Sequence, residues 1–264
     1  MPNYRFFVQY DGTRYDGWQR QKNTDRTIQG KLENILLHLF DDTVEVHGSG
    51  RTDAGVHAFA QVANFHSPEG AKEIELHRIE EYINAYLPED ISVFGLEAAP
   101  PRFHSRLSAV GKTYCYRIYT GKDRPVFARR YVWWLPGKLD EEAMRQAAAL
   151  LEGTHDYASF CANPKMKKST VRCVDSLTVR RQGELLIIQA HGNGFLHNMV
   201  RILTGTLVQV GLGERPAKEM QELLLAKDRR QAGPAAPAQG LCLESVDYRP
   251  AFVPPLEGQG RNIW

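Results

Sequence analysis

The stretch Gly48-Ser-Gly-Arg-Thr-Asp-Ala-Gly-Val-His-Ala58 joins two apolar segments and carries one carboxylate, Asp53, beside one guanidinium, Arg51. Three glycines within eight residues permit tight or left-handed backbone conformations that other residues resist. Such a loop can hold Asp53 over a surface and let a ligand approach closely. Because no second acid accompanies it, the loop indicates chemistry centred on a single aspartate. The alternative, that Asp53 only stabilises a turn through its side chain, stays open on composition.

The residues around this loop predict one α+β unit. Alternating apolar positions predict strands at residues 4–10, 44–47, 59–65 and 91–96, and helical spacing predicts helices that start at Ile28 and Leu76. Thr27 suits the N-cap of the first helix, and Pro88 ends the second. The resulting order, β-α-β-β-α-β, is the ferredoxin-like split βαβ pattern.

The second half of the chain repeats this order. It predicts a strand at 112–119, a helix capped by Asp140, a hairpin of strands 174–181 and 185–191, a helix at 199–210, another from Pro216, and a strand at 241–247. The predicted fold class is therefore α+β, with two tandem ferredoxin-like units, residues 1–104 and 105–264. Their strands are expected to form a central antiparallel or mixed sheet beside a basic cleft. Residues 233–239 are expected to be a flexible connector.

The net charge of +2 conceals a segregation of charge. Residues 69–97 hold eight acids against two bases, whereas residues 101–131 hold eight bases against one acid. A second basic cluster comprises Lys165, Lys167, Lys168 and Arg172. Segregation of this kind indicates a face that meets a polyanion, although basic loops with no such partner would look similar.

The composition excludes several protein classes. No apolar run approaches membrane-spanning length, and the amino terminus has no signal-peptide pattern, so we expect no membrane association. The four cysteines are scattered without a C-x-x-C pair, which argues against disulfides or a zinc knuckle and favours the cytoplasm. His47, His57 and His66 match no metal-ligand spacing, so no metal is expected.

The sequence also lacks several well-known catalytic and nucleotide-binding motifs. The glycine loop lacks the P-loop and dinucleotide fingerprints, and the sequence lacks the zinc deaminase and G-x-S-x-G signatures.

Two further features suggest a nucleic-acid site. Tyr114 and Tyr116 face the same way on a strand flanked by Lys112 and Arg117, an arrangement suited to base stacking beside phosphates, although two core rings would look similar. Arg201 lies within an apolar helical run, where a guanidinium is costly without an acid. We therefore predict a long-range pairing of Arg201 with Asp53.

Several motifs of the sequence together resemble those of the bacterial tRNA pseudouridine synthase A family. They are the loop at 48–58, Lys-Thr-Tyr-Cys-Tyr-Arg at 112–117, Phe-Leu-x-x-Met-Val-Arg at 195–201, Gly-Leu-Cys-Leu at 240–243, Tyr-Asp-Gly-Thr-x-Tyr-x-Gly-Trp-Gln at 10–19 and Thr-Ile-Gln-Gly-x-Leu-Glu at 27–33. The resemblance covers nearly the whole chain, from residue 4 to about residue 250.

The resemblance implies a pseudouridine synthase fold and a cofactor-free homodimeric enzyme. Its members isomerise uridine to pseudouridine at positions 38, 39 and 40 of the tRNA anticodon arm. It also implies that Asp53 is the catalytic aspartate, that Tyr114 is the active-site aromatic residue, and that Arg201 is the partner of the aspartate.

Other residues take substrate-binding roles. By resemblance, Arg51 helps to extrude the target nucleotide, and Leu241 and Leu243 fall on the strand of an apolar pocket. That pocket must retain the detached uracil, a role that also suits Phe195. The basic residues expected to contact tRNA include Lys112, Lys165, Lys167 and Lys168.

Two other functions remain as alternatives. A non-catalytic RNA-binding protein could use tandem ferredoxin-like sheets, but the RNP1 pattern is missing and a binder has no evident use for Arg-Thr-Asp on a glycine loop. A base-flipping RNA glycosylase would use the same carboxylate and release free uracil.

Overall fold

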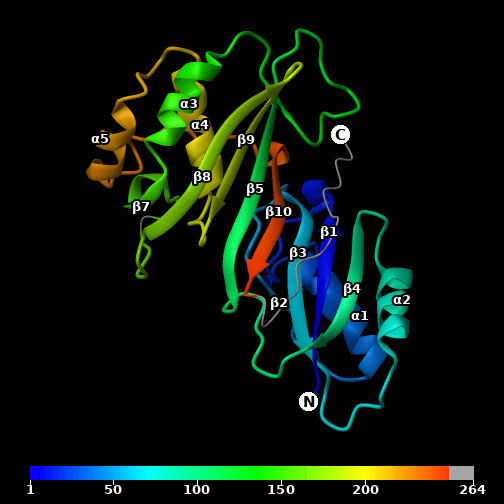
Figure 1. Cartoon of the computed structure of the whole chain (residues 1–264). Coiled ribbons are helices and arrows are strands. Elements are labelled where there is room, and N and C mark those ends of the chain that lie inside the picture. The colour runs from blue at the N-terminus through cyan, green and yellow to red at the C-terminus, as the bar shows by residue number, and fades with distance from the viewer. Residues whose placement is uncertain (164, 250–264) are drawn as a thin grey trace.

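The computed structural model describes residues 1–163 and 165–249 of the 264-residue chain. Ten strands form one sheet in the order β4-β1-β3-β10-β5-β9-β8-β7, with β2 paired to β3 and β6 paired to β5 (Figure 1). The strands are β1 (Asn3–Tyr10), β2 (His47–Gly48), β3 (His57–His66), β4 (Ile91–Ala99), β5 (Ala109–Tyr119), β6 (Trp133–Trp134), β7 (Gly153–Asp156), β8 (Val171–Gln182), β9 (Leu185–Gly192) and β10 (Leu241–Tyr248). The helices are α1 (Ile28–Phe40), α2 (Leu76–Tyr86), α3 (Glu141–Ala149), α4 (Met199–Gly211) and α5 (Glu219–Ala226), with short 3₁₀ helices η1 (Gly12–Arg14), η2 (Ala158–Phe160) and η3 (Ala238–Gly240).

The first unit follows the predicted order β1-α1-β2-β3-α2-β4. The Thr27 side chain accepts a hydrogen bond from the Gly30 amide, so it caps α1 as expected. Strand β2 is only two residues long, and the predicted strand at 44–47 is realised there only at its end. The second unit contains the predicted hairpin, β8 and β9, and the helix predicted from Pro216, which is α5 and begins at Glu219. Strands β6 and β7 are additional to the prediction. The α+β class is thus confirmed.

Strand β10 joins the two units into one mixed sheet. It runs parallel to β3, where Leu243 pairs with Ala58, and antiparallel to β5, where Leu243 pairs with Tyr114. The last strand of the described ranges therefore lies in the middle of the sheet, between the strand that follows the Asp53 loop and the strand that carries Tyr114 (Figure 1). The boundary between residues 104 and 105 stays a prediction.

The main hydrophobic core lies between the helices and one face of the sheet. It contains Phe6 and Val8 of β1 together with buried side chains from α1, α2, α3 and α4. A smaller cluster of Phe7, Val62 and Phe103 lies on the other face. This alternation along β1 follows the period of two that a strand imposes. Tyr114 and Leu243 belong to the helix-covered face.

The expected flexible connector at 233–239 packs against α4 instead. The Gly233 amide donates to Thr206 Oγ1, and the Ala236 amide donates to the Arg201 carbonyl. A Cβ atom added at Gly205 would come within 1.9 Å of the Pro234 carbonyl oxygen, so the two backbones touch. Small residues in this segment therefore permit close packing rather than mobility.

None of the helices in the described ranges has the length and apolar character that crossing a membrane requires.

Candidate active site

The Asp53 loop is held in place by the segment at residues 15–18. The Trp18 amide donates to the Thr52 carbonyl at 3.1 Å, and the Gly55 amide donates to the Tyr15 carbonyl at 3.2 Å. On the sheet side, the Tyr10 and Thr52 hydroxyls share a buried hydrogen bond of 2.8 Å. The two motifs at 10–19 and 48–58 thus form one structure, and the loop is fixed on both sides of Asp53.

Glycine is needed at two positions of this contact. Gly17 has φ of +100°, and a Cβ atom there would lie 2.6 Å from the Thr52 carbonyl oxygen. Gly55 has φ of +78°, next to the turn in which the Val56 amide donates to the Asp53 carbonyl. Residues with a side chain adopt these conformations at a cost, so the glycines set the direction in which Asp53 projects.

Asp53 meets two basic side chains from the start of α4 and the residues just before it. Its Oδ2 lies 3.7 Å from Arg201 Nη1, and its Oδ1 lies 3.5 Å from His197 Nε2. The Asp53 side chain is 29% exposed and that of Arg201 is 17% exposed. The predicted long-range pairing is therefore confirmed as an ion pair in a partly open site. His197 was not predicted, although it lies within the motif that ends at Arg201.

Arg201 is fixed by partners other than Asp53. Its Nε donates to the Ala236 carbonyl at 2.7 Å, and its Nη1 donates to Asn198 Oδ1 at 2.9 Å. The guanidinium therefore keeps its orientation without a direct hydrogen bond to the aspartate. This leaves the carboxylate paired electrostatically and still able to react.

Tyr114 is almost fully buried on β5. Its ring meets that of Phe195 edge-on, with the ring centroids 5.3 Å apart. Burial raises the pKa of the Tyr114 hydroxyl well above its usual value, and the negative charge of Asp53 raises it further. The phenol therefore stays protonated at neutral pH. No hydrogen bond from this hydroxyl to another described residue is present.

Tyr116 and the two leucines belong to the core. Tyr116 is fully buried and donates to the Pro237 carbonyl at 2.7 Å, so the prediction that it contributes to base stacking is wrong. Leu241 pairs with Tyr116, and Leu243 pairs with Tyr114 across the two strands. Both leucines are buried, with Leu243 fully enclosed beside Tyr114. Their contact with uracil stays a prediction.

Lys112 differs from the expected surface cation. Its Nζ donates to the Ser49 carbonyl at 2.7 Å, beneath the glycine loop. Burial lowers the pKa of the Lys112 ammonium to about 8, and the nearby charge of Arg106 lowers it further. A lysine in this position supports the loop more directly than it meets a phosphate. The sequence shows its charge but not its burial.

The other predicted basic residues are exposed. Arg51 has its Nε bound to Gln19 Oε1 at 2.9 Å. Lys165, Lys167 and Lys168 lie in the segment between η2 and β8. They remain predictions as tRNA contacts.

Two of the histidines weighed as metal ligands, His47 and His57, have other partners. The His47 ring stacks on that of His104 with centroids 4.7 Å apart. His57 Nδ1 accepts from the Gly12 amide at 3.0 Å, and its Nε2 lies 2.9 Å from the Arg130 carbonyl, to which it donates. Within residues 1–163 and 165–249, no group of three or more His, Cys, Asp or Glu side chains could hold a metal ion.

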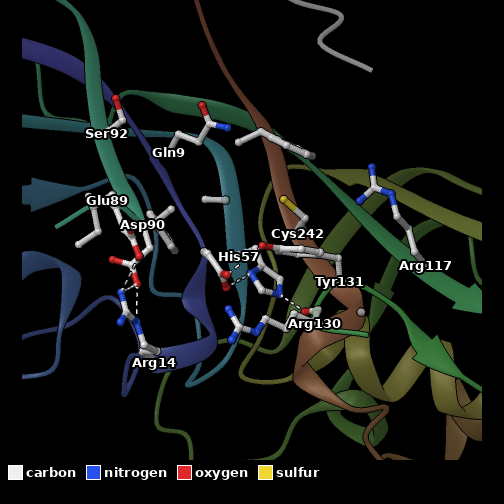
Figure 2. Close-up of a pocket in the computed structure, with 16 residues that line it drawn as sticks. Gln9, Arg14, His57, Glu89, Asp90, Ser92, Arg117, Arg130, Tyr131 and Cys242 are labelled. Carbon is white, nitrogen blue, oxygen red and sulfur yellow. Dashed lines mark hydrogen bonds and ion pairs between the residues drawn. The ribbon is translucent and has the colours of Figure 1, made fainter. Parts of the chain in front are cut away.

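A cavity of about 670 Å³ opens on the other face of the sheet (Figure 2). His57, Arg117, Tyr131 and Cys242 are among the residues that line it. Because successive strand residues point to opposite faces, Cys242 places this cavity on the face away from Leu243 and Tyr114. Asp53 does not line it.

Comparisons with known proteins agree with the motifs. A family model described as tRNA pseudouridine synthase matches residues 6–107 and 147–249. A protein of Bacillus anthracis named tRNA pseudouridine synthase A 2 is 44% identical over 248 residues, which cover 94% of this chain and 100% of that protein. Proteins named tRNA pseudouridine synthase A are 43% identical in Bacillus sp. (strain KSM-64) and 40% identical in Sinorhizobium fredii, each aligned over 94% of this chain and 100% of its own length. The chain therefore belongs to the tRNA pseudouridine synthase family.

Proposed function

We propose that this protein isomerises uridine to pseudouridine at positions 38, 39 and 40 of the tRNA anticodon arm, with Asp53 as the catalytic residue. Family membership gives the reaction class, an isomerase that acts on uridine in tRNA. The contact of Asp53 with Arg201, on the same face of the sheet as Tyr114, is the observation that carries the assignment of residues.

The reaction breaks the N1–C1′ glycosidic bond, turns the uracil and joins C5 to C1′, and the C5 proton leaves at the end. The freed N1 takes up one proton as C5 gives one up, so the product is an isomer of the substrate and the chemistry calls for no redox cofactor or metal. The base must first leave the stack, at a cost of a few kcal/mol that is smaller in a loop. Arg51, at the exposed edge of the Asp53 loop, is suited to grip a phosphate and occupy the vacated space.

Asp53 must be ionised to react. Arg201 holds a positive charge 3.7 Å from its Oδ2, so the carboxylate has an oppositely charged partner in a partly buried site. The carboxylate then acts as a nucleophile at C1′ or as a base at C2′. Both routes require an ionised carboxylate next to the ribose. Tyr114 supplies a neutral phenol beside the uracil and, with Phe195, a wall of the pocket that retains the detached base.

We also infer the assembly that binds the tRNA. The protein acts as a cytoplasmic homodimer, and one tRNA contacts both subunits through basic residues that include Lys165, Lys167 and Lys168. Residues 1–104 form the unit with the Asp53 loop, and residues 105–264 form the unit with Tyr114 and Arg201. The segregation of basic residues along the second unit supports an electrostatic contact with RNA.

One incubation separates the three candidate functions. The full-length protein is mixed with tRNA that carries tritium at C5 of its uridines. Release of tritium with the base retained in the RNA is expected for isomerisation. Free labelled uracil would indicate a glycosylase, and unchanged RNA that is nevertheless bound would indicate a binder. Repeating the assay with tRNAs that contain a single uridine, at position 38, 39 or 40, tests the site assignment.

A further inference from the structure

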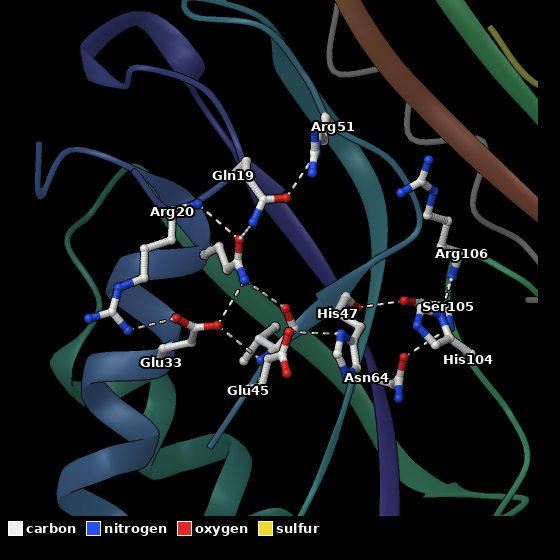
Figure 3. Close-up of polar contacts among 12 residues, drawn as sticks. Gln19, Arg20, Glu33, Glu45, His47, Arg51, Asn64, His104, Ser105 and Arg106 are labelled. Carbon is white, nitrogen blue, oxygen red and sulfur yellow. Dashed lines mark hydrogen bonds and ion pairs between the residues drawn. The ribbon is translucent and has the colours of Figure 1, made fainter. Parts of the chain in front are cut away.

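A chain of side-chain hydrogen bonds runs from the buried start of α1 to Arg51 (Figure 3). Glu33 Oε1 accepts from Gln29 Nε2 at 2.8 Å, and Gln29 Oε1 accepts from Gln19 Nε2 at 2.6 Å. Gln19 Oε1 then accepts from Arg51 Nε at 2.9 Å. Gln19 and the pair Gln29 and Glu33 come from the motifs at 10–19 and 27–33, to which the proposed reaction assigns no role.

The buried end of this chain is fully bonded. Gln29 and Glu33 are 6% and 7% exposed. Glu33 Oε1 also accepts from the Val46 amide at 3.1 Å, and Glu33 Oε2 accepts from Arg20 Nη1 at 3.0 Å. The Gln29 amide group donates a second bond to the Val46 carbonyl at 3.1 Å, so both its hydrogens are used. These groups have no freedom to rearrange without losing a buried hydrogen bond.

The bonding pattern dictates the orientation of each amide. The Glu33 carboxylate and the Val46 carbonyl can only accept, so Gln29 must turn its NH₂ group toward them and its oxygen toward Gln19. Gln19 must then present its NH₂ group to Gln29, which leaves its oxygen for Arg51. The direction of the chain therefore places an acceptor where the Arg51 Nε–H needs one.

Arg51 is held through one nitrogen only. Gln19 is the hydrogen-bond partner of its side chain, through Nε, and Nη1 and Nη2 make no hydrogen bond to any other residue in the described ranges. The guanidinium is thus anchored at its inner nitrogen and presents its two outer nitrogens from an exposed residue. The two outer nitrogens can therefore donate to a phosphate, or enter the space that an extruded base leaves.

We propose that Gln19 and Gln29 are positioning residues that hold Arg51 ready to extrude the target nucleotide. The proposal rests on the proposed function, because it takes from there the role of Arg51. Holding a long side chain before the RNA arrives removes part of the entropy that binding would otherwise cost. The motifs at 10–19 and 27–33 therefore serve the reaction through Arg51 and not only through the packing of α1.

A double-mutant cycle distinguishes positioning from mere structural support. The variants are Gln19→Met, Arg51→Ala and the combination of the two, and Gln21→Met is the matched control because its side chain donates to the Asp16 carbonyl at an exposed site of the same segment. Each is assayed for the single-turnover rate of tritium release from C5-labelled tRNA, for the dissociation constant of an anticodon stem-loop, and for thermal unfolding.

Gln19→Met should slow the single-turnover step about tenfold and change the dissociation constant less than threefold, because docking of the stem-loop precedes extrusion. In the Arg51→Ala background the same change should have no further effect. Gln19→Asn keeps the amide but is one methylene too short to reach both Gln29 and Arg51, so it should slow the reaction to the same extent. This variant provides the test if Gln19→Met does not fold. Gln21→Met should match the wild type.

A wild-type rate for both Gln19 variants, or a slowing by Gln19→Met that is as large without Arg51 as with it, would overturn the positioning role. Absence of tritium release from the wild-type protein would instead refute the proposed function, so the two failures are distinguishable.

Discussion

Arg201 Nη1 lies 3.7 Å from Asp53 Oδ2, although one residue belongs to a glycine loop of the first unit and the other to a helix of the second. The guanidinium is oriented by the Ala236 carbonyl and by Asn198, so the ion pair with Asp53 is not what holds it in place. Asp53 can therefore be changed without releasing Arg201, which makes the aspartate a clean target for mutation.

Asp53→Asn should abolish pseudouridine formation, by roughly a thousandfold or more, because an amide neither attacks C1′ nor removes a proton from C2′. The measurement is the single-turnover rate of tritium release, with stem-loop affinity measured in parallel. Affinity should stay within about threefold of wild type, since phosphate contacts dominate it. Asp25→Asn, at an exposed position, is the control. Appreciable residual pseudouridine would contradict the role of Asp53.

Tyr114→Phe removes a hydroxyl that has no hydrogen-bond partner among the described residues while it keeps the ring against Phe195. Folding and stem-loop affinity should be preserved, and any proton transfer through the phenol should be lost. We expect a rate reduction of about 10²-fold, the lower end for general acid–base catalysis. Single-turnover kinetics would show it. Equal activity would reduce Tyr114 to a wall of the pocket.

The stability of the protein should depend on Lys112 at alkaline pH. Burial lowers the pKa of its ammonium to about 8, whereas in the unfolded chain it is about 10.4. Between these values the unfolded chain binds the extra proton, so the free energy of unfolding should rise with pH, by at most about 3 kcal/mol. Below pH 8 both states are protonated and the cost of burying the charge is at its full value.

Urea unfolding at pH 7.5 and pH 9.5 of the wild type and Lys112→Met would measure this rise. The difference in unfolding free energy between the two proteins should move in favour of the wild type at the higher pH. Lys122→Met, at an exposed position, serves as the comparison. A difference that does not change with pH would show that the ammonium of Lys112 is hydrated in the folded protein.

Replacing Lys165, Lys167 and Lys168 together with glutamine should weaken tRNA binding and reduce its salt dependence. Each lost phosphate contact lowers the slope of log K against log salt by about 0.7 to 0.9, so the slope should fall by about 2 if all three bind RNA. Fluorescence titrations between 50 and 200 mM salt would give the slopes. Replacing Lys22, Lys72 and Lys138, which are also exposed, controls for net charge. Unchanged slopes would remove this cluster from the interface.

The sequence predicts much of the local structure from local rules, and it predicts the central ion pair from the cost of an unpaired charge in an apolar run. Thr27 caps α1 as its hydroxyl allows, and Arg201 pairs with Asp53 because a guanidinium inside an apolar helix requires an acid. The place of β10 in the sheet could not be predicted, since pairing between distant strands leaves no periodic signal. The burial of Lys112 and the packing of residues 233–239 against α4 could not be predicted for a similar reason. Burial of a lysine and contact between two backbones depend on what lies opposite in space.

The contact of His197 with Asp53 could not be predicted from the sequence either. It lies four residues before Arg201, and its Nε2 comes within 3.5 Å of Asp53 Oδ1. A histidine just before an apolar helix has no pattern that separates a surface residue from one facing a catalytic acid. Once Asp53 and Arg201 are paired, however, the position of His197 near the start of the same helix makes it the next side chain to test.

The position of β10 has a consequence for biosynthesis. Residues 241–248 emerge from the ribosome after all the other described strands, yet they occupy the gap between the half-site with Asp53 and the half-site with Tyr114. A nascent chain can form its first hairpins early. Strands β3 and β5 become part of one sheet only when β10 pairs with both of them. Activity should therefore arise late in translation, and a chain that stops before residue 241 should be inactive because it lacks the strand that pairs with both β3 and β5.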